Sequence, residues 1–252
     1  FGGNTVTHGL PGKDEFETLT LEDVRQWLLP QFKNSTLEIS IVGDMDESEI
    51  VSLCSKYFGS LPAKDYAEHG SEVLPRFPVR QSYETSMPLT EDKGLVQMAW
   101  LTDDYWDIKR TRRLHILAAV IDERLRKLIR EESGDSYSPA AFSSNSRIYP
   151  GYGRMVIEVM TDGTSLDSVV DQIDQVIQSL HEDPVTKDEL ERSKQPVLTS
   201  IKDRIKTNGY WLSSVLALST RHPEQLEWSQ TIIDDFNSIT IADLSTLIER
   251  YM

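Results

Sequence analysis

The sequence predicts an α+β fold in which helices pack on one face of a largely antiparallel sheet. Three observations lead to this prediction: a buried-strand pattern that runs into a long amphipathic helix, a hairpin after that helix, and several further helices without intervening strands. A hairpin pairs its strands antiparallel, and consecutive helices are not the alternation that builds a parallel sheet. The helices should therefore bury their apolar stripes against one side of the sheet.

The first strand is expected at residues 94–101, where an apolar run extends from Leu95 to Trp100. A helix from about residue 107 to 131 follows, because its apolar residues recur at spacings of three, four, four and three. This stripe consists of Leu114, Leu117, Ile121, Leu125 and Leu128.

A hairpin is expected next, with strands at residues 136–148 and 152–161 on either side of the turn at Tyr149-Pro150-Gly151. Met155, Ile157 and Val159 alternate along its second strand. Helical patterns then cover residues 166–180, 187–206, 211–218, 225–236 and 242–251. Pro196 should kink or divide the second of these helices.

Residues 19–32 and 239–252 match in residue type and suggest a weak internal repeat, although chance similarity of two short capped helices is an alternative. Each copy has a threonine in the N-cap position, Thr20 or Thr240, and an aspartate three residues later, Asp23 or Asp243.

A strand is expected at residues 37–42 and a helix at 48–58, with Cys54 on the apolar face of that helix as a small core residue rather than a nucleophile. No strand follows the second copy of the repeat, which ends at Met252. Three explanations remain open: an early end of the chain, a disordered last strand, or strand 37–42 in the corresponding place of the second sheet.

The polar, proline-bounded stretch between Pro62 and Pro78 marks a domain boundary. The 252 residues suffice for one large domain, or for one domain with part of another. The chain starts at Phe1 without an initiator Met or a signal-peptide pattern, so we expect a piece of a longer protein.

Composition excludes several classes of partner. The 26 Lys and Arg against 41 Asp and Glu give a formal charge of −15, and the pI is about 4.7. Nucleic acid and anionic membrane are thus disfavoured as main partners, since phosphate would be repelled. No apolar run approaches the roughly 18 residues of a membrane span. A single cysteine excludes an internal disulfide.

No catalytic or metal-binding motif is present in the sequence. The histidines stand at positions 8, 69, 115, 181 and 222, and neither HExxH nor HxxEH occurs. GxSxG, the phosphate-binding GxxxxGK[S/T] and a complete GxGxxG are also missing. We therefore expect no metal or cofactor in this chain and no enzymatic activity of the chain by itself.

One helix is basic against this acidic background. Between Asp107 and Arg130 there are eight basic and three acidic residues, a local charge of 8 − 3 = +5. Either these side chains pair with neighbouring acids on a solvated face, or they form a positive surface for an acidic partner or a substrate carboxylate.

Residues 130–138, Arg-Glu-Glu-Ser-Gly-Asp-Ser-Tyr-Ser, begin at the end of the long helix, continue through a glycine turn and place a tyrosine seven residues after the arginine, at the start of a strand. This arrangement resembles the non-catalytic half of the insulinase/pitrilysin (inverzincin) family of zinc peptidases. Residues 41–46, 57–62, 186–194 and 239–244 are also similar to family segments, in the family's order.

The resemblance implies a metallohydrolase-like two-layer domain at residues 93–252, a linker at 63–92, and the tail of a preceding insulinase-like domain at 1–62. It also implies a clam-shell peptidase whose N-terminal half holds zinc through HxxEH, while the zinc-free half closes the chamber over a peptide. The implied partners are the peptide substrate and that catalytic half, in the same protein or in a partner subunit. Arg130 and Tyr137 match the family residues that reach the substrate around the scissile bond.

Several alternatives stay open. Arg130 could instead cap its helix while Tyr137 packs in the sheet. The chain could be a catalytically dead structural or assembly module of the same family, or an unrelated α+β binding domain. The residues do not reveal the compartment; a periplasmic or otherwise exported bacterial protein is the expectation that similar long-chain relatives suggest.

Overall fold

The computed structural model describes residues 12–62, 75–86, 88, 90–133 and 138–252, and of residues 130–133 it describes the backbone alone. The chain divides into two units. The first comprises residues 1–78 and 208–220, and the second comprises residues 79–207 and 221–252.

A three-stranded antiparallel sheet lies in the second unit. Its strands are β1 (Lys93–Thr102), β2 (Ser138–Asn145) and β3 (Gly153–Asp162), in the order β1-β3-β2. Met155, Ile157 and Val159 of β3 are 0% exposed on one face of the sheet. On the other face, Leu95 and Met160 lie opposite each other and are 56% and 60% exposed. The apolar core therefore lies on one side of the sheet, and the predicted hairpin is confirmed.

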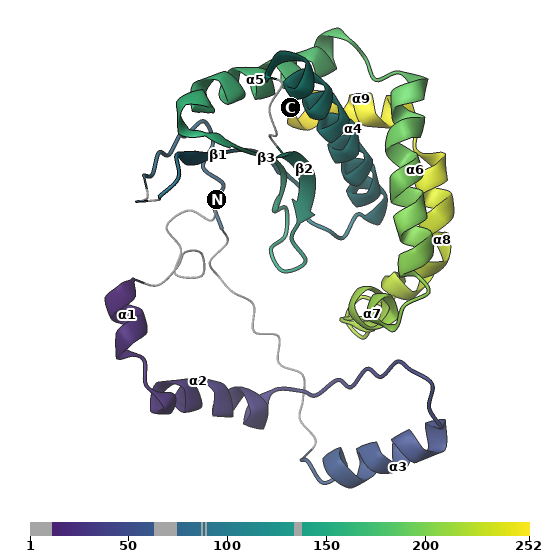
Figure 1. The fold of residues 1–252 in the computed structure, drawn as a ribbon. Helices are drawn as coiled ribbons and strands as arrows, with labels where there is room; N and C mark the ends of the chain where they lie inside the picture. The colour runs from purple at the N-terminus through teal and green to yellow at the C-terminus, as the bar shows by residue number, and fades with distance from the viewer. Residues whose placement is uncertain (1–11, 63–74, 87, 89, 134–137) are drawn as a thin grey trace. The chain divides into compact units, whose positions relative to one another are not determined.

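Helix α4 (Ile108–Ser133) packs against the sheet and forms the middle of this core (Figure 1). Leu114, Leu117, Ile121 and Leu125, which belong to the predicted stripe, are completely buried. Burial of one such side chain contributes about 1.5–3 kcal/mol. The helix predicted from the spacing of these residues is confirmed.

The other helices of the second unit follow the hairpin. They are α5 (Leu166–Glu182), preceded by the short 3-10 helix η1 (Gly163–Ser165), then α6 (Lys187–Arg204), α8 (Glu224–Ser238) and α9 (Ile241–Tyr251). Helices α5, α6, α8 and α9 all contact α4. The predicted fold class is confirmed: an antiparallel sheet carries a layer of helices packed on it.

Helix α6 continues through Pro196, so the expected division of this element does not occur. A proline removes one hydrogen bond to the carbonyl four residues earlier, here that of Arg192. Both Pro196 and Arg192 are exposed, so water can satisfy that carbonyl and the helix persists.

In residues 208–220, which belong to the first unit, the predicted helix takes an unusual form. The short helix α7 (Asn208–Tyr210) leads into a π-helix, η2 (Trp211–Leu216). The N–H of Ala217 donates to the carbonyl of Leu212, a bond over five residues that is typical of a π-helix. Leu218 then adopts a left-handed φ of 67°, which ends the helical segment.

The first unit also contains α1 (Lys13–Thr18), α2 (Leu21–Asn34) and α3 (Glu47–Phe58), none of which has a buried residue. Cys54 on α3 is half-buried, so its predicted place in a core was wrong. The physical reason is that α3 buries no apolar face within the described part of its unit.

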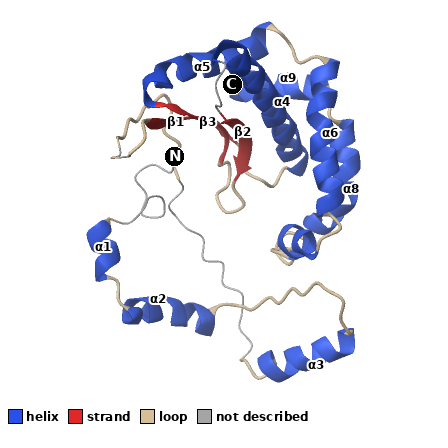
Figure 2. Cartoon of the chain, in the orientation of Figure 1, coloured by secondary structure: helices blue, strands red, loops and turns tan. Residues whose placement is uncertain are grey.

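The strand predicted at residues 37–42 was also wrong. The segment between α2 and α3 is loop throughout (Figure 2). A strand requires a neighbouring strand for its backbone hydrogen bonds, and in the described part of the chain none pairs with these residues. The described sheet of the second unit consists of β1, β3 and β2.

Both copies of the predicted repeat begin with the expected cap. The Thr20 hydroxyl accepts from the N–H of Asp23, whose carboxylate accepts from the N–H of Thr20, at 3.2 and 2.8 Å. Thr240 and Asp243 form the same capping box at 3.3 and 2.9 Å. The capped starts of α2 and α9 are thus confirmed.

Candidate functional site

The two residues proposed for substrate binding flank one connection in the second unit. Arg130 lies in the last turn of α4, and Tyr137 immediately precedes Ser138, the first residue of β2. The side chain of Arg130 and the whole of Tyr137 are outside the described residues. The structure therefore defines the helix that contains Arg130 and the strand that begins at Ser138, but not the contacts of the two side chains.

The elements on both sides of this connection are well anchored. Leu125 and Ile129 near the end of α4 are buried in the core, and Pro139 at the start of β2 is buried as well. Asp122 links the two elements: its Oδ1 accepts from the N–H of Ala141 at 3.3 Å. The α4–β2 connection thus spans two rigid, mutually bonded elements.

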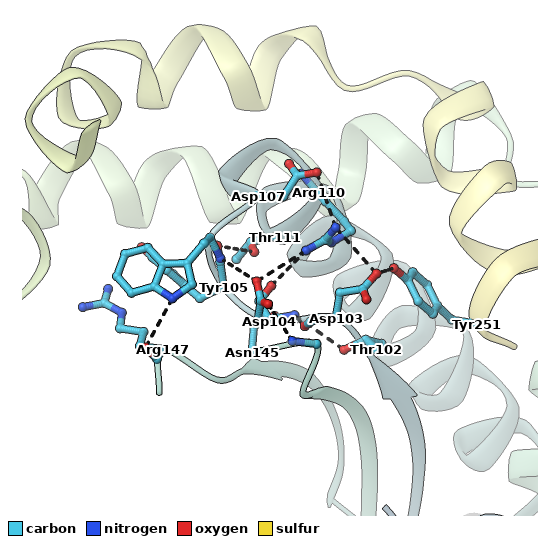
Figure 3. A network of polar contacts seen from close by, with 12 residues as sticks. Thr102, Asp103, Asp104, Tyr105, Asp107, Arg110, Thr111, Asn145, Arg147 and Tyr251 are labelled. Atoms are coloured by element: carbon cyan, nitrogen blue, oxygen red, sulfur yellow. Dashed lines mark hydrogen bonds and ion pairs between the residues drawn. The ribbon is translucent and has the colours of Figure 1, made fainter. Parts of the chain in front are cut away.

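A polar network lies near the other end of α4 (Figure 3). At its centre, the carboxylate of Asp103 accepts a hydrogen bond from the Tyr251 hydroxyl. It accepts a second hydrogen bond from Arg250, at 2.7 Å, and lies 3.6 Å from the guanidinium of Arg110. The backbone oxygen of Asp103 accepts from Nδ2 of Asn145 at 2.7 Å. These contacts join β1, α4, β2 and the end of α9.

The neighbouring carboxylate, Asp104, holds the turn of the hairpin. It accepts from the N–H of Gly151 at 2.6 Å and from the N–H of Trp106 at 3.1 Å, and it lies 3.8 Å from Arg110. Gly151 has a left-handed φ of 65°, which glycine adopts without strain. The network therefore sets the position of the turn between β2 and β3.

The contacts of Tyr251 in this network favour its protonated form. Burial, the hydrogen bond to Asp103 and the charge of that carboxylate raise the pKa of Tyr251 to about 12. The phenol thus remains neutral near pH 7 and donates to a carboxylate that also accepts from Arg250. The hydrogen bond ties the end of α9 to Asp103, which directly follows β1.

Aromatic side chains cover the same region. Trp106 stacks on His222, with ring centroids 3.3 Å apart and planes inclined by 17°. The indole Nε1 of Trp106 donates to the backbone oxygen of Arg147 at 3.2 Å, and the guanidinium of Arg147 lies 4.2 Å from the ring centroid of Tyr105. These contacts tie the loop before α4 to the hairpin and to the start of α8.

Sequence reasoning missed this network because its partners are far apart in the chain. Asp103 and its partners Arg250 and Tyr251 are separated by 147 and 148 residues. The local signal that could have indicated part of this network is the pair of Asp107 and Arg110, which are three residues apart on the helix and lie 3.5 Å from each other.

The basic helix is largely neutralised by neighbouring acids, as one of the two interpretations of its charge predicted. Five of its arginines form ion pairs, three of them with residues distant in the sequence. They are Arg110 with Asp103, Asp104 and Asp107, Arg112 with Asp235, Arg113 with Asp243, Arg124 with Glu189, and Arg126 with Asp122.

Within the described ranges, no group of three or more His, Cys, Asp or Glu residues could hold a metal ion. The described residues therefore do not fit a zinc centre. The same ranges contain no helix with the length and apolar character that a membrane span needs.

Comparison with known proteins shows which family this chain belongs to. The sequence model of the family described as "Peptidase M16 inactive domain" matches residues 18–197. This chain belongs to that family. The match includes the whole of α4, β2, β3 and α5, and so contains both Arg130 and Tyr137. The resemblance to the non-catalytic half of the insulinase peptidases, which are M16 peptidases, is confirmed.

Relatives of this M16 inactive domain include peptidases of plants and bacteria. The chain is 24% identical over 289 residues to the chloroplastic stromal processing peptidase of Pisum sativum, covering 95% of this chain and 23% of the relative. It is 24% identical over 223 residues to the uncharacterized zinc protease YmxG of Bacillus subtilis, covering 83% of this chain and 52% of the relative. The chain thus spans about a quarter to a half of these proteins.

The fold of the M16 inactive domain also matches solved structures. A conserved protein from Enterococcus faecalis V583 aligns with a TM-score of 0.72 at 20% identity, over 94% of this chain and 55% of that one. The protease FusC, solved with Arabidopsis ferredoxin, aligns with a TM-score of 0.70 at 15% identity, over 95% of this chain and 26% of that one. These alignments support the fold.

Proposed function

We propose that this chain is the zinc-free part of an M16 metalloendopeptidase, which binds the peptide and closes the chamber while a zinc-bearing half hydrolyses the peptide bond. The observation that carries the proposal is the match of residues 18–197 to the M16 inactive domain. The complete hydrophobic core of the second unit supports it, because such a core provides a rigid wall for substrate contacts.

Arg130 and Tyr137 are proposed to contact the peptide around the scissile bond. The seven-residue spacing across a helix end and a strand start supports this assignment, because it brings both residues to the same connection. A guanidinium has five N–H donors and a phenol has one O–H donor. Both can donate to a peptide carbonyl or to the oxyanion that develops from it, and exclusion of water from a closed chamber strengthens these bonds.

The proposed organisation of the chain assigns residues 1–62 to the tail of a preceding M16-like domain, 63–92 to a linker and 93–252 to the final domain. The absence of buried residues in α1, α2 and α3, all described, supports the first assignment. Trp27 of α2, for example, is 69% exposed. Helices with such exposed apolar faces need partner surfaces to become stable.

The test is peptide hydrolysis with zinc present, first by this chain alone and then by a mixture with the zinc-bearing half. We expect no hydrolysis by the chain alone, weak hydrolysis by the zinc-bearing half alone, and full hydrolysis by the mixture. If the mixture is no more active than the zinc-bearing half, although the two bind each other, the chain is a structural or assembly module instead. Hydrolysis by the chain alone would also contradict the proposal.

A further inference from the structure

A pocket of about 410 Å³ lies within the first unit, where the loop between α2 and α3 meets the segment that contains the π-helix η2. Both segments belong to this unit, although they are far apart in the sequence. Ligand sites typically have volumes of about 300–1,000 Å³, so this pocket is large enough for a long side chain of a ligand. Its lining residues are Glu38, Ser40, Leu212, Ser213, Ala217 and Leu218.

The pocket contains a carboxylate that lacks a cation. Among the described residues, none forms an ion pair or a side-chain hydrogen bond with Glu38. By contrast, the carboxylates of Glu189 and Asp235 in the second unit are each paired with an arginine. The hydroxyls of Ser40 and Ser213 add oxygen atoms to the same lining, and no basic side chain is among its residues. The pocket therefore has a negative potential that favours a cation.

Apolar side chains supply the rest of the lining. Leu212 is 42% exposed, whereas Tyr210 and Val215 in the same segment are only 7% and 2% exposed. Tyr210 and Val215 thus anchor the segment, while the side chain of Leu212 remains accessible. Together with Leu218, it provides an apolar surface close to the carboxylate of Glu38.

Two backbone irregularities occur among the lining residues. The N–H of Ala217 donates to the carbonyl of Leu212 over five residues, and Leu218 has a left-handed φ of 67°. A left-handed backbone is unfavourable for a residue with a Cβ atom, and π-helical turns are rare. Both features occur frequently at functional sites. Here they determine the path of the backbone on which three of the lining residues lie.

We propose that this pocket binds a basic side chain of a peptide, with the charge at Glu38 and the apolar stem against Leu212 and Leu218. The guanidinium of an arginine or the ammonium of a lysine supplies the missing cation, and the hydroxyls of Ser40 and Ser213 can accept its remaining N–H groups. Such side chains bury their methylene stems on apolar surfaces and keep the charged head in a polar environment. The net charge of −15 also attracts cationic peptides.

The proposal deepens the proposed function, on which it rests for a peptide as the ligand, and names the class of side chain that the peptide presents. It concerns the first unit alone, and none of the pocket residues belongs to the second unit.

The test measures binding by the whole 252-residue chain, using the fluorescence anisotropy of a short labelled alanine peptide with one central arginine. We expect saturable binding that weakens about fivefold when citrulline, which has a similar shape without the charge, replaces the arginine. Glu38→Gln should weaken binding of the arginine peptide by the same factor and leave the citrulline peptide unaffected. The matched control is Glu47→Gln, which removes an equal charge from an exposed position of the same unit and should keep wild-type affinity.

Leu218→Gly separates binding from stability. Glycine adopts the left-handed conformation without strain, so the Tm should not decrease. Loss of the apolar side chain should nevertheless weaken binding of the arginine peptide at least about threefold. A lower Tm with unchanged affinity would give Leu218 a purely structural role and contradict its place in the pocket.

Several results would overturn the proposal. They are equal affinities for the arginine and citrulline peptides, wild-type affinity of Glu38→Gln, or an equal loss of affinity in Glu47→Gln. Binding of n-butylguanidine as tight as that of the peptide would also overturn it, because the ligand would then be a small free cation.

These binding measurements are independent of the hydrolysis that tests the proposed function. If binding depends on Glu38 while the mixture with the zinc-bearing half gains no activity, the pocket stands and the role in hydrolysis fails. If the mixture is fully active while binding does not depend on Glu38, the proposed function stands and the pocket assignment fails.

Discussion

Arg124 of α4 and Glu189 of α6 form a two-point ion pair. Nε and one terminal nitrogen of the arginine lie 2.9 and 3.3 Å from the two carboxylate oxygens of Glu189. The remaining donors of Arg124 bond Ser179 at 3.1 Å and the carbonyl of Asp183 at 3.0 Å, at the end of α5. One side chain thus joins three helices of the second unit.

Removal of this arginine should destabilise the second unit. Arg124→Ala removes the cation that pairs with Glu189, and it leaves this mostly buried carboxylate with the donors of Thr186 alone; the side chains of Arg124 and Glu189 are only 12% and 18% exposed. We expect a loss of about 3–5 kcal/mol in the free energy of unfolding, measured by urea denaturation. The control Lys206→Ala removes an ion pair that is more than 70% exposed and should change stability by less than about 0.5 kcal/mol. Equal effects of the two variants would contradict this account.

The same ion pair predicts a pH dependence. Burial alone would raise the pKa of Glu189, but hydrogen bonds from Arg124 and Thr186 and the charge of Arg124 outweigh it and lower the pKa from its ordinary 4.5. A group whose pKa is lower in the folded state stabilises fully above the unfolded pKa, and this stabilisation is lost as the pH falls through the folded pKa. Stability should therefore be level down to about pH 5 and decrease below it. Urea midpoints of Glu189→Gln should decrease less steeply; an identical slope would disprove the role of Glu189.

The hydrogen bond between Tyr251 and Asp103 should delay the titration of the Tyr251 phenol at alkaline pH. The pKa of Tyr251 is raised to about 12, so its contribution to stability is complete below pH 10 and is lost as the pH rises towards 12. Ultraviolet absorbance should show a phenol that titrates this late, and Tyr251→Phe should remove the contribution of that phenol. At pH 7 this variant should lose about 1 kcal/mol of stability, because Arg250 still donates to Asp103. A titration curve unchanged in Tyr251→Phe would refute the assignment.

Gly153 at the start of β3 leaves no room for a side chain. A Cβ atom there would overlap the backbone oxygen of Asp103 and lie 2.7 Å from Oγ1 of Thr102 and 2.9 Å from Nδ2 of Asn145. Gly153→Ala should lower the free energy of unfolding by about 1–3 kcal/mol, because the network around Asp103 must shift. Gly209→Ala is the matched control, since a Cβ there meets nothing within 4 Å. Thermal unfolding that is equally affected by both substitutions would contradict the prediction.

Substitution of the proposed substrate contacts should lower activity without affecting the metal. In the intact peptidase, Arg130→Ala or Tyr137→Phe should reduce kcat by about 100- to 1,000-fold, as for the loss of one oxyanion donor. Zinc content should stay at the wild-type level, because the zinc is expected in the other half. Lys127→Ala, which removes a neighbouring exposed cation of α4, serves as the control. Unaltered turnover in both variants would rule out the assigned roles.

The sequence predictions were correct where the structure depends on residues a few positions apart, and wrong where it depends on a distant partner. The stripe from Leu114 to Leu128 predicted α4, and the threonine and aspartate pairs predicted the capped starts of α2 and α9, because each pattern acts within a few residues of itself. The strand at residues 37–42 was wrong for the opposite reason. Its apolar alternation is local, but a strand forms only when a partner elsewhere accepts its hydrogen bonds.

The features of the candidate site also fall into those that the sequence could indicate and those that depend on the tertiary structure. The spacing of Arg130 and Tyr137 is local and could be recognised in the sequence, as could the absence of HxxEH. The contact of Asp122 with Ala141 could not, because it depends on the packing of α4 against the edge of the sheet.

The sequence by itself determined the helices of the second unit, the capped starts of α2 and α9, the hairpin and the α+β class, since periodicity and short motifs encode them directly. Its quoted segments also carried the resemblance to the M16 family, which the family comparison confirmed. Only the tertiary structure decided how the charges of α4 are used. Arg124 pairs with Glu189, Arg112 with Asp235 and Arg113 with Asp243 across long stretches of chain. Such pairings follow from the three-dimensional packing of a common core, which no local pattern specifies.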